Sequence, residues 1–207
     1  YYAKALAETK AKGRIKPLSL DPLMAVRSYH DIGGAGAKAD AYSIWICQFI
    51  DSRIHVLDHF TSQGQSLAFH VKWMRDHGYE GAEVILPHDG VNTNNVSGKR
   101  YEHHWEEAGF SVKVVPNQGT GAAMMRIEAA RRLFPRIYFD VDLTQVGRTS
   151  LGWYHPKIVE REGSKVDLGP NHDWASHDAD SFGLMCVDYR EPKVMAPTVT
   201  VPSFGAV

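Results

Sequence analysis

The order of its apolar segments constrains the fold of this chain most. Three strand-like segments come first, at residues 24–32, 43–50 and 53–60, and Asp51 and Ser52 form a two-residue turn between the last two. Helix-like and strand-like segments then alternate along the rest of the chain. A meander followed by such an alternation predicts an α/β domain with a mixed β-sheet and helices on both faces of the sheet.

The individual segments are recognised by their periodicity and by the residues that end them. Leu67, Val71 and Met74 recur at helical spacing within residues 65–77, and Gly78 follows. The other helices are expected at residues 1–12, 100–108, 121–134, 143–154 and 174–189. Further strands are expected at residues 83–86, 111–115 and 138–139, and a small hairpin is expected over residues 158–168.

Charge and hydropathy exclude several classes of protein. The chain has 23 Lys and Arg against 24 Asp and Glu, so it lacks the basic excess of a free-standing duplex binder, although residues 1–16 are basic. The longest nearly apolar run, residues 42–50, is too short to span a bilayer, which needs about 20 residues. The first residues show no pattern of a secretory signal.

Cysteine and histidine usage limits the metal chemistry. The two cysteines, Cys47 and Cys186, stand in apolar segments and are expected to be reduced core residues of a cytosolic protein. The 11 histidines include no His-Glu-x-x-His motif, which disfavours a zinc centre. Most of them are expected to be structural. No phosphate-binding P-loop motif and no Gly-x-Ser-x-Gly motif occurs.

Two acidic residues follow predicted strands. Asp31 stands at the end of the first strand, before a glycine-rich loop, and Asp89 comes just after the strand at residues 83–86. Catalytic residues of α/β folds gather at the carboxyl ends of strands, so the two carboxylates meet if these strands are neighbours. The alternative is that both residues only form turns or cap helices.

The last predicted helix carries a third acidic position. At about 100° per residue, Asp173, His177 and Asp180 fall in one narrow stripe, and Asp178 lies off it. The helix is therefore expected to direct His177 and Asp180 at one point, with Asp173 further back. A solvated acidic face is the alternative. Three converging carboxylates suit Mg²⁺ or Mn²⁺, and two such ions about 4 Å apart can hold the reacting oxygens of a phosphodiester.

Several segments resemble the large terminase subunits of tailed phages. Residues 31–34, with Asp40 and the strand that contains Trp45, resemble the first acidic motif, and residues 86–89 resemble the second. The segments 129–135 and 172–182 resemble later motifs. Residues 1–15 resemble the helix that ends the ATPase domain of that family. The resemblance covers residues 1–190 in the family's order.

The resemblance implies an RNase H-like nuclease that cuts double-stranded concatemeric DNA during viral packaging. It implies two Mg²⁺ or Mn²⁺ ions held by Asp31, Asp89 and Asp180, with His177 as a further catalytic residue. Residues 1–22 would then be the end of the ATPase-domain helix and the interdomain linker, and residues 23–190 the nuclease domain. Residues 191–207 would be a flexible tail. The packaging ATPase itself is missing from the chain.

The implied partners are double-stranded DNA, the ATPase domain, the small terminase subunit and the portal protein, in the cytoplasm of an infected bacterium and without a membrane. Lys99 and Arg100 are candidate phosphate contacts, as are four arginines between residues 126 and 136 unless they form an ordinary solvated face. Two alternatives stay open. One is another RNase H-like nuclease, of resolvase or transposase type, and the other is a non-catalytic module that docks on DNA or on a portal.

Overall fold

The computed structural model describes residues 1–33, 40–93, 98–161 and 163–191. Most of the glycine-rich loop after Asp31 and nearly all of the predicted tail lie outside these residues. In the described part, the predicted mixed sheet is confirmed. Its strands are β1 (Val26–Asp31), β2 (Ala41–Ile50), β3 (Arg53–Gln63), β4 (Glu83–Leu86), β5 (Ser111–Val114) and β6 (Ile137–Phe139).

The strand order of this sheet is β5-β4-β1-β2-β3-β6. Strands β1, β2 and β3 form the predicted antiparallel meander, and Asp51, in the turn between β2 and β3, has a positive φ of 54°. Strand β4 pairs in parallel with β1, β5 with β4, and β6 with β3. The carboxyl ends of β1 and β4 therefore lie side by side at one edge of the sheet.

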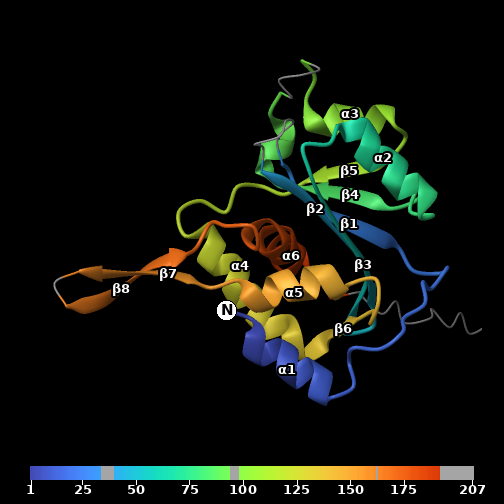
Figure 1. The fold of residues 1–207 in the computed structure, drawn as a ribbon. Helices are drawn as coiled ribbons and strands as arrows, with labels where there is room; N and C mark the ends of the chain where they lie inside the picture. Colours follow the sequence, from blue (N-terminus) through green and yellow to red (C-terminus); the bar gives the residue numbers. More distant parts are fainter. Residues whose placement is uncertain (34–39, 94–97, 162, 192–207) are drawn as a thin grey trace, which may run out of the picture.

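Helices cover both faces of the sheet, as predicted (Figure 1). The helices are α1 (Ala3–Ala11), α2 (Leu67–Asp76), α3 (Tyr101–Glu107), α4 (Ala122–Leu133), α5 (Gln145–Trp153) and α6 (Ser176–Asp188), with short 3₁₀ turns η1 (His88–Val91) and η2 (Phe134–Arg136). Helices α2 and α3 contribute Met74 and Trp105 to one hydrophobic core, whereas Ile127, Leu151 and Phe182 from α4, α5 and α6 belong to the other.

Strand β2 separates the two cores. All residues from 42 to 49 are buried, which explains why this segment is the longest apolar run of the chain. Ile44 and Ile46 belong to the core under α2 and α3, and Trp45 and Cys47 belong to the opposite core. This alternation follows from the two-residue period of a strand, and it requires apolar side chains on both faces.

Helix α6 lies against β1 and β2 and also contacts α4 and α5. Between Ala175 and Cys186, every residue except Asp180 is buried. The apolar side chains Ala179 and Phe182 of α6 lie in the core, where Phe182 packs edge-on against Trp45. Polar side chains on so buried a helix need partners, because an unpaired buried polar group is costly.

Helix α1 packs onto the same layer. Tyr2 is fully buried, and its ring lies 5.6 Å from that of Phe134 and 5.9 Å from that of Tyr154. The helix ends at Ala11, one residue before the predicted end, and Gly13 follows with a φ of 66° that glycine readily adopts.

The predicted hairpin near the end of the chain is also confirmed. It consists of β7 (Pro156–Arg161) and β8 (Ser164–Pro170), which extend away from the main sheet (Figure 1). In the part of the chain that the structure describes, each helix is too short or too polar to cross a bilayer.

Candidate active site

Asp31 and Asp89 follow neighbouring strands, which is the condition set above for their carboxylates to meet. Asp31 is the last residue of β1, and Tyr29 of β1 is paired with Ile85 of parallel β4. Asp89 lies in η1, two residues after Pro87 breaks the strand. Its side chain is 54% exposed, and Oδ1 accepts a hydrogen bond of 3.1 Å from Asn92 Nδ2. The turn therefore presents the Asp89 carboxylate to solvent beyond the sheet edge.

Helix α6 brings His177 to Asp31. His177 Nδ1 lies 3.1 Å from Asp31 Oδ2, and Nε2 lies 3.8 Å from Asp40 Oδ1. Asp180 stands three residues later, and its Oδ1 lies 3.2 Å from Nη1 of Arg126 on α4. This ion pair between Asp180 and Arg126 was not predicted from the sequence.

The close approach of α4 to α6 depends on Gly183. A Cβ atom at Gly183 would lie 2.6 Å from Cβ of Arg126, so a larger residue would push the helices apart. Arg126 also donates from Nε and Nη2 to Oε1 of Gln118, at 3.2 and 3.1 Å. Gly183, one turn after Asp180, was the signal in the sequence that another element crosses the helix here.

Electrostatics at this site favours the binding of a positive charge. Burial raises the pKa of Asp31 above its ordinary value, although the hydrogen bond from His177 opposes this, and the Asp180 carboxylate raises the pKa further. The hydrogen bond to Asp31 raises the pKa of His177, and the charges of Asp31, Asp40 and Asp180 add to it, while burial opposes the shift. A cation bound near Asp31 would relieve the crowding of negative charge.

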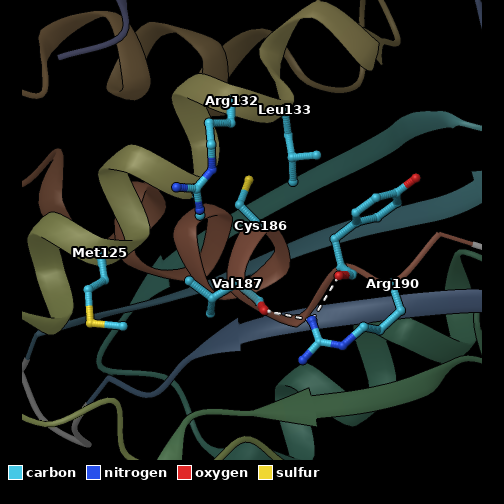
Figure 2. A pocket seen from close by; sticks show the side chains of 8 residues that line it. Met125, Arg132, Leu133, Cys186, Val187 and Arg190 are labelled. Atoms are coloured by element: carbon cyan, nitrogen blue, oxygen red, sulfur yellow. Dashed lines mark hydrogen bonds between the residues drawn. The ribbon is translucent and has the colours of Figure 1, made fainter.

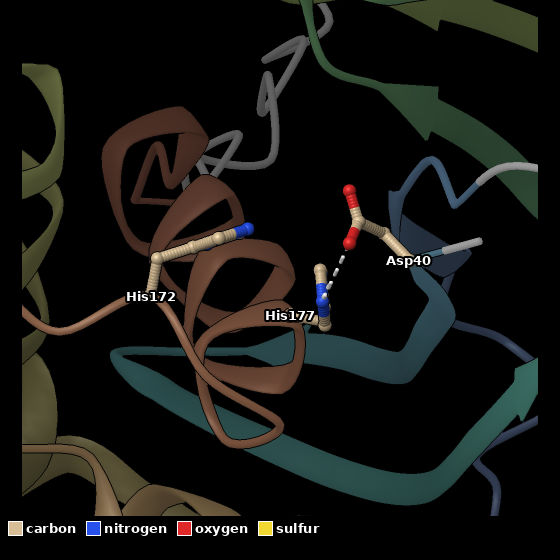
Figure 3. Close-up of side chains that lie close together, drawn as sticks. All are labelled: Asp40, His172 and His177. Carbon is tan, nitrogen blue, oxygen red and sulfur yellow. Dashed lines mark ion pairs between the residues drawn. The ribbon is translucent and has the colours of Figure 1, made fainter. Parts of the chain in front are cut away.

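The spacing of the ligand atoms distinguishes two sets of side chains. Among the residues that the structure describes, one group of three His, Cys, Asp or Glu side chains has ligand atoms all within 4.8 Å of one another: Asp40, His172 and His177 (Figure 3). Asp31, Asp89 and Asp180, all within the described ranges, do not form a group at this spacing. Their joint role in binding metal therefore stays a prediction.

Asp173 does not lie on the helix stripe, and that prediction was wrong. Helix α6 begins at Ser176, and Asp173 precedes it, where its Oδ1 accepts a hydrogen bond of 2.9 Å from the Ala175 amide. The Asp173 carbonyl oxygen accepts another from the Ser176 amide at 3.0 Å. An aspartate that bonds to the backbone two residues later favours a turn over the helix that periodicity suggested.

Asp178 points away from Asp31, as its position off the stripe predicted. Its Oδ1 accepts a hydrogen bond of 2.8 Å from His59 Nε2, and the side chains of both residues are at most 3% exposed. The Asp178 carbonyl oxygen accepts another bond of 2.8 Å from the Trp45 indole. Asp178 thus ties α6 to β2 and β3.

The candidate DNA contacts Lys99 and Arg100 lie just before α3, and both are exposed. Lys99 Nζ lies 2.8 Å from a carboxylate oxygen of Glu107, and Arg100 Nη1 lies 3.2 Å from one of Glu102. A phosphate would have to replace these partners, and the proposed role of the two side chains stays a prediction.

A separate groove of about 490 Å³ lies between α4 and the end of α6 (Figure 2). It does not include the four predicted catalytic residues. Arg190 at its edge donates from Nη1 to the carbonyl oxygens of Val187 and Tyr189, at 3.2 and 2.9 Å. The groove is lined by Met125, Ala129, Arg132, Leu133, Cys186, Val187, Tyr189 and Arg190.

The strand order and the two helical layers define an α/β domain of the RNase H-like fold. Among solved structures, the chain is similar to nuclease domains of large terminases. The nuclease of the thermophilic phage G20c with bound magnesium matches at a TM-score of 0.58 and 12% identity, over 85% of this chain and 93% of that one. The manganese-bound nuclease domain of bacteriophage SPP1 matches at a TM-score of 0.53 and 14% sequence identity. This match covers 82% of this chain and 91% of the SPP1 domain.

The large terminase of a further thermophilic bacteriophage is a longer chain. It matches at a TM-score of 0.56 and 12% identity, over 84% of this chain but only 42% of that one. No family sequence model matches this chain, and no curated protein sequence matches it. The similarity to terminase nuclease domains therefore rests on the fold, which is shared over most of this chain.

Proposed function

We propose that this chain is the metal-dependent endonuclease domain of a viral DNA-packaging terminase. One observation carries the proposal: Asp31 and Asp89 follow adjacent parallel strands, and α6 brings His177 to within 3.1 Å of Asp31. Nuclease domains of phage terminases share this fold, and two of them were solved with magnesium or manganese bound. Fold alone does not assign an activity, so the proposal depends on these side chains.

The proposed cofactor is a pair of Mg²⁺ or Mn²⁺ ions held by Asp31, Asp89 and Asp180. The donor set fits, because carboxylate oxygens suit these hard cations and because burial without a cation raises the pKa of Asp31. When bound, the ions would polarise the scissile phosphodiester and stabilise its attacking and leaving oxygens. Arg126 occupies one oxygen of Asp180 and holds that carboxylate in place.

His177 is proposed to move a proton during cleavage. Its Nδ1 is engaged by Asp31, which fixes the orientation of the ring and leaves Nε2 to accept or release the proton. Asp31 therefore has a second role as the group that positions His177. The substrate is proposed to be double-stranded concatemeric DNA, with Lys99 and Arg100 as phosphate contacts.

The wider assembly follows from the same proposal. Residues 1–22 would join the nuclease, residues 23–190, to a packaging ATPase domain, and residues 191–207 would form a flexible tail. The small terminase subunit and the portal would be further partners, in the cytoplasm of the infected bacterium. A further domain beside the nuclease is consistent with the longer large terminase described above, because the match covers only 42% of that chain.

Nicking of supercoiled plasmid by the purified chain tests the proposal directly. We expect relaxed and linear products with Mn²⁺ or Mg²⁺ and none with a chelator. Cleavage restricted to branched junctions would favour the resolvase-type alternative. Absence of cutting on every DNA form would favour a docking module.

The His177→Ala variant should retain detectable Mn²⁺-dependent cutting but be slowed by at least about tenfold. General acid–base assistance contributes about 10² to 10⁴ in rate, whereas stabilisation by bound cations would remain. Single-turnover nicking rates of this variant and of Asp180→Ala, which should be inactive, provide the comparison. Wild-type speed in His177→Ala would limit this histidine to a structural role.

Binding of the isolated chain to duplex DNA should be weak and without sequence preference, because its net charge is −1. Replacing both Lys99 and Arg100 with Ala should lower the salt dependence of binding by about two phosphate contacts. Fluorescence anisotropy over a KCl series measures this, with the Lys4→Ala, Lys10→Ala double variant of α1 as control. If the logarithm of the binding constant falls with the logarithm of the KCl concentration at the same slope in both double variants, Lys99 and Arg100 are excluded as phosphate contacts.

A further inference from the structure

We propose that Asp40, His172 and His177 form a binding site for a borderline divalent transition-metal ion such as Zn²⁺ or Co²⁺. The ligand atoms of the three side chains lie within 4.8 Å of one another, and the His172 ring is directed toward the other two (Figure 3). Two imidazoles and one carboxylate favour such ions over Mg²⁺, which prefers oxygen ligands. This site goes beyond the proposed nuclease but shares His177 with it, so an ion bound at His177 Nε2 would block the proton transfer proposed for that atom.

Hydrogen bonds assign the tautomer of His172. The Ser176 hydroxyl donates to the carbonyl oxygen of Asp173 at 2.7 Å, so its oxygen accepts the hydrogen bond of 3.0 Å from His172 Nδ1. The proton of a neutral His172 ring therefore stays on Nδ1, and Nε2 carries the free lone pair that a metal ion needs.

His177 has the same arrangement with a different partner. Its Nδ1 donates to Asp31 Oδ2 at 3.1 Å, and its Nε2 lies 3.8 Å from Asp40 Oδ1. A carboxylate that accepts the outer N–H of a histidine orients the ring and strengthens it as a metal ligand. Both histidines thus have outer partners at Nδ1 and direct Nε2 toward the proposed site.

The backbone places Asp40 beside the histidines. A Cβ atom at Gly33 would lie 2.3 Å from the Asp40 carbonyl oxygen, so only glycine permits the segment just after β1 to approach Asp40 this closely. Asp31 is also paired with Ser43 of antiparallel β2. The start of β2, which Asp40 directly precedes, therefore lies beside the end of β1.

The distances suit a small cation after a minor movement of exposed side chains. Zn–ligand distances of about 2.0 Å in a tetrahedron separate two ligand atoms by about 3.3 Å. The Asp40–His177 separation of 3.8 Å is close to this, and the Asp40 side chain is 68% exposed, so it can move toward the ion. The exposure of Asp40 and His172 also leaves room for an exchangeable ligand such as water.

Titration of the untagged, metal-free chain with Co²⁺ in excess Mg²⁺ tests the site, because Mg²⁺ occupies oxygen-only sites. Visible d–d absorption should appear at one equivalent and be displaced by Zn²⁺. His172→Ala and Asp40→Asn should each weaken Co²⁺ binding at least about tenfold, and Ser176→Ala should weaken it about tenfold through the tautomer. His103→Ala, an exposed histidine on α3, should bind as the wild type does.

A second measurement observes the imidazole nitrogens directly. In ¹⁵N spectra of the wild-type imidazoles, Zn²⁺ should shift two of the 11 histidines, and His172→Gln should remove one of the shifted signals. Unchanged Co²⁺ affinity in both His172→Ala and Asp40→Asn, with folded circular dichroism spectra, would overturn the proposal. Plasmid cutting that persists in that case would leave the proposed nuclease intact and reject only the additional site.

Discussion

The Asp31→Asn variant is expected to lose metal-dependent DNA cutting by at least about a thousandfold while remaining folded. Charge stabilisation by bound metal supplies several kcal/mol, and about 4 kcal/mol corresponds to a factor of about a thousand in rate. Without metal, removal of this carboxylate should leave thermal stability unchanged or raise it, because burial and Asp180 disfavour its charged form. Single-turnover plasmid nicking and thermal unfolding in chelator measure the two effects.

The matched control for this experiment is Asp51→Asn. Asp51 lies in the hairpin turn between β2 and β3, and asparagine tolerates its positive φ of 54°. This variant removes a carboxylate at the opposite end of β2 and should cut at the wild-type rate. Cutting by Asp31→Asn at a rate similar to that of the control would reject the proposed active site.

The Asp178→Ala variant should lower the free energy of unfolding by about 3 kcal/mol. It leaves His59 buried without its carboxylate partner, and breaking a buried pair costs about 3–5 kcal/mol. For a chain of this length the melting temperature should fall by about 6–12 °C. Asp76→Ala, which removes an exposed carboxylate paired with Lys72, should change it by less than about 2 °C.

The difference in free energy of unfolding between wild type and Asp178→Ala should depend on pH, because the pKa of Asp178 is shifted in the folded chain. Burial alone would raise that pKa, but the hydrogen bond from His59 and the other polar contacts lower it overall. A depressed carboxyl pKa contributes stability above the pKa of the unfolded chain, and this contribution is lost as pH falls through the folded value. The stability of wild type and Asp178→Ala should therefore converge on acidification. Chemical unfolding at several pH values measures this, and a constant difference would contradict the assignment.

Local patterns in the sequence predicted the secondary structure and the fold class. The two-residue turn at Asp51, the helical spacing of Leu67 and Met74, and the apolar run before Ile50 each depend on neighbours in the chain. The sequence also placed Asp31 and Asp89 at the ends of strands, but it left open whether these strands are neighbours, which depends on the order of strands in the sheet.

Contacts between distant segments were harder to predict. The pairing of Arg126 with Asp180 depends on how α4 crosses α6, because Gly183 indicates only that some element approaches α6 and not which side chain that element carries. The position of Asp173 was predicted wrongly because periodicity was extended across a turn that its own side chain stabilises. Asp40 and His172 approach His177 only after β2 and α6 have packed, so their cluster could not be derived from spacing alone.

The hydrogen bond between Asp31 and His177 joins residues that are 146 positions apart in the chain. Because α6 is buried between the sheet and helices α4 and α5, it can occupy its place only after those layers have formed. During synthesis, α6 is the last helix of the described chain to leave the ribosome. A nascent chain would thus lack the proposed cutting site until α6 has been made.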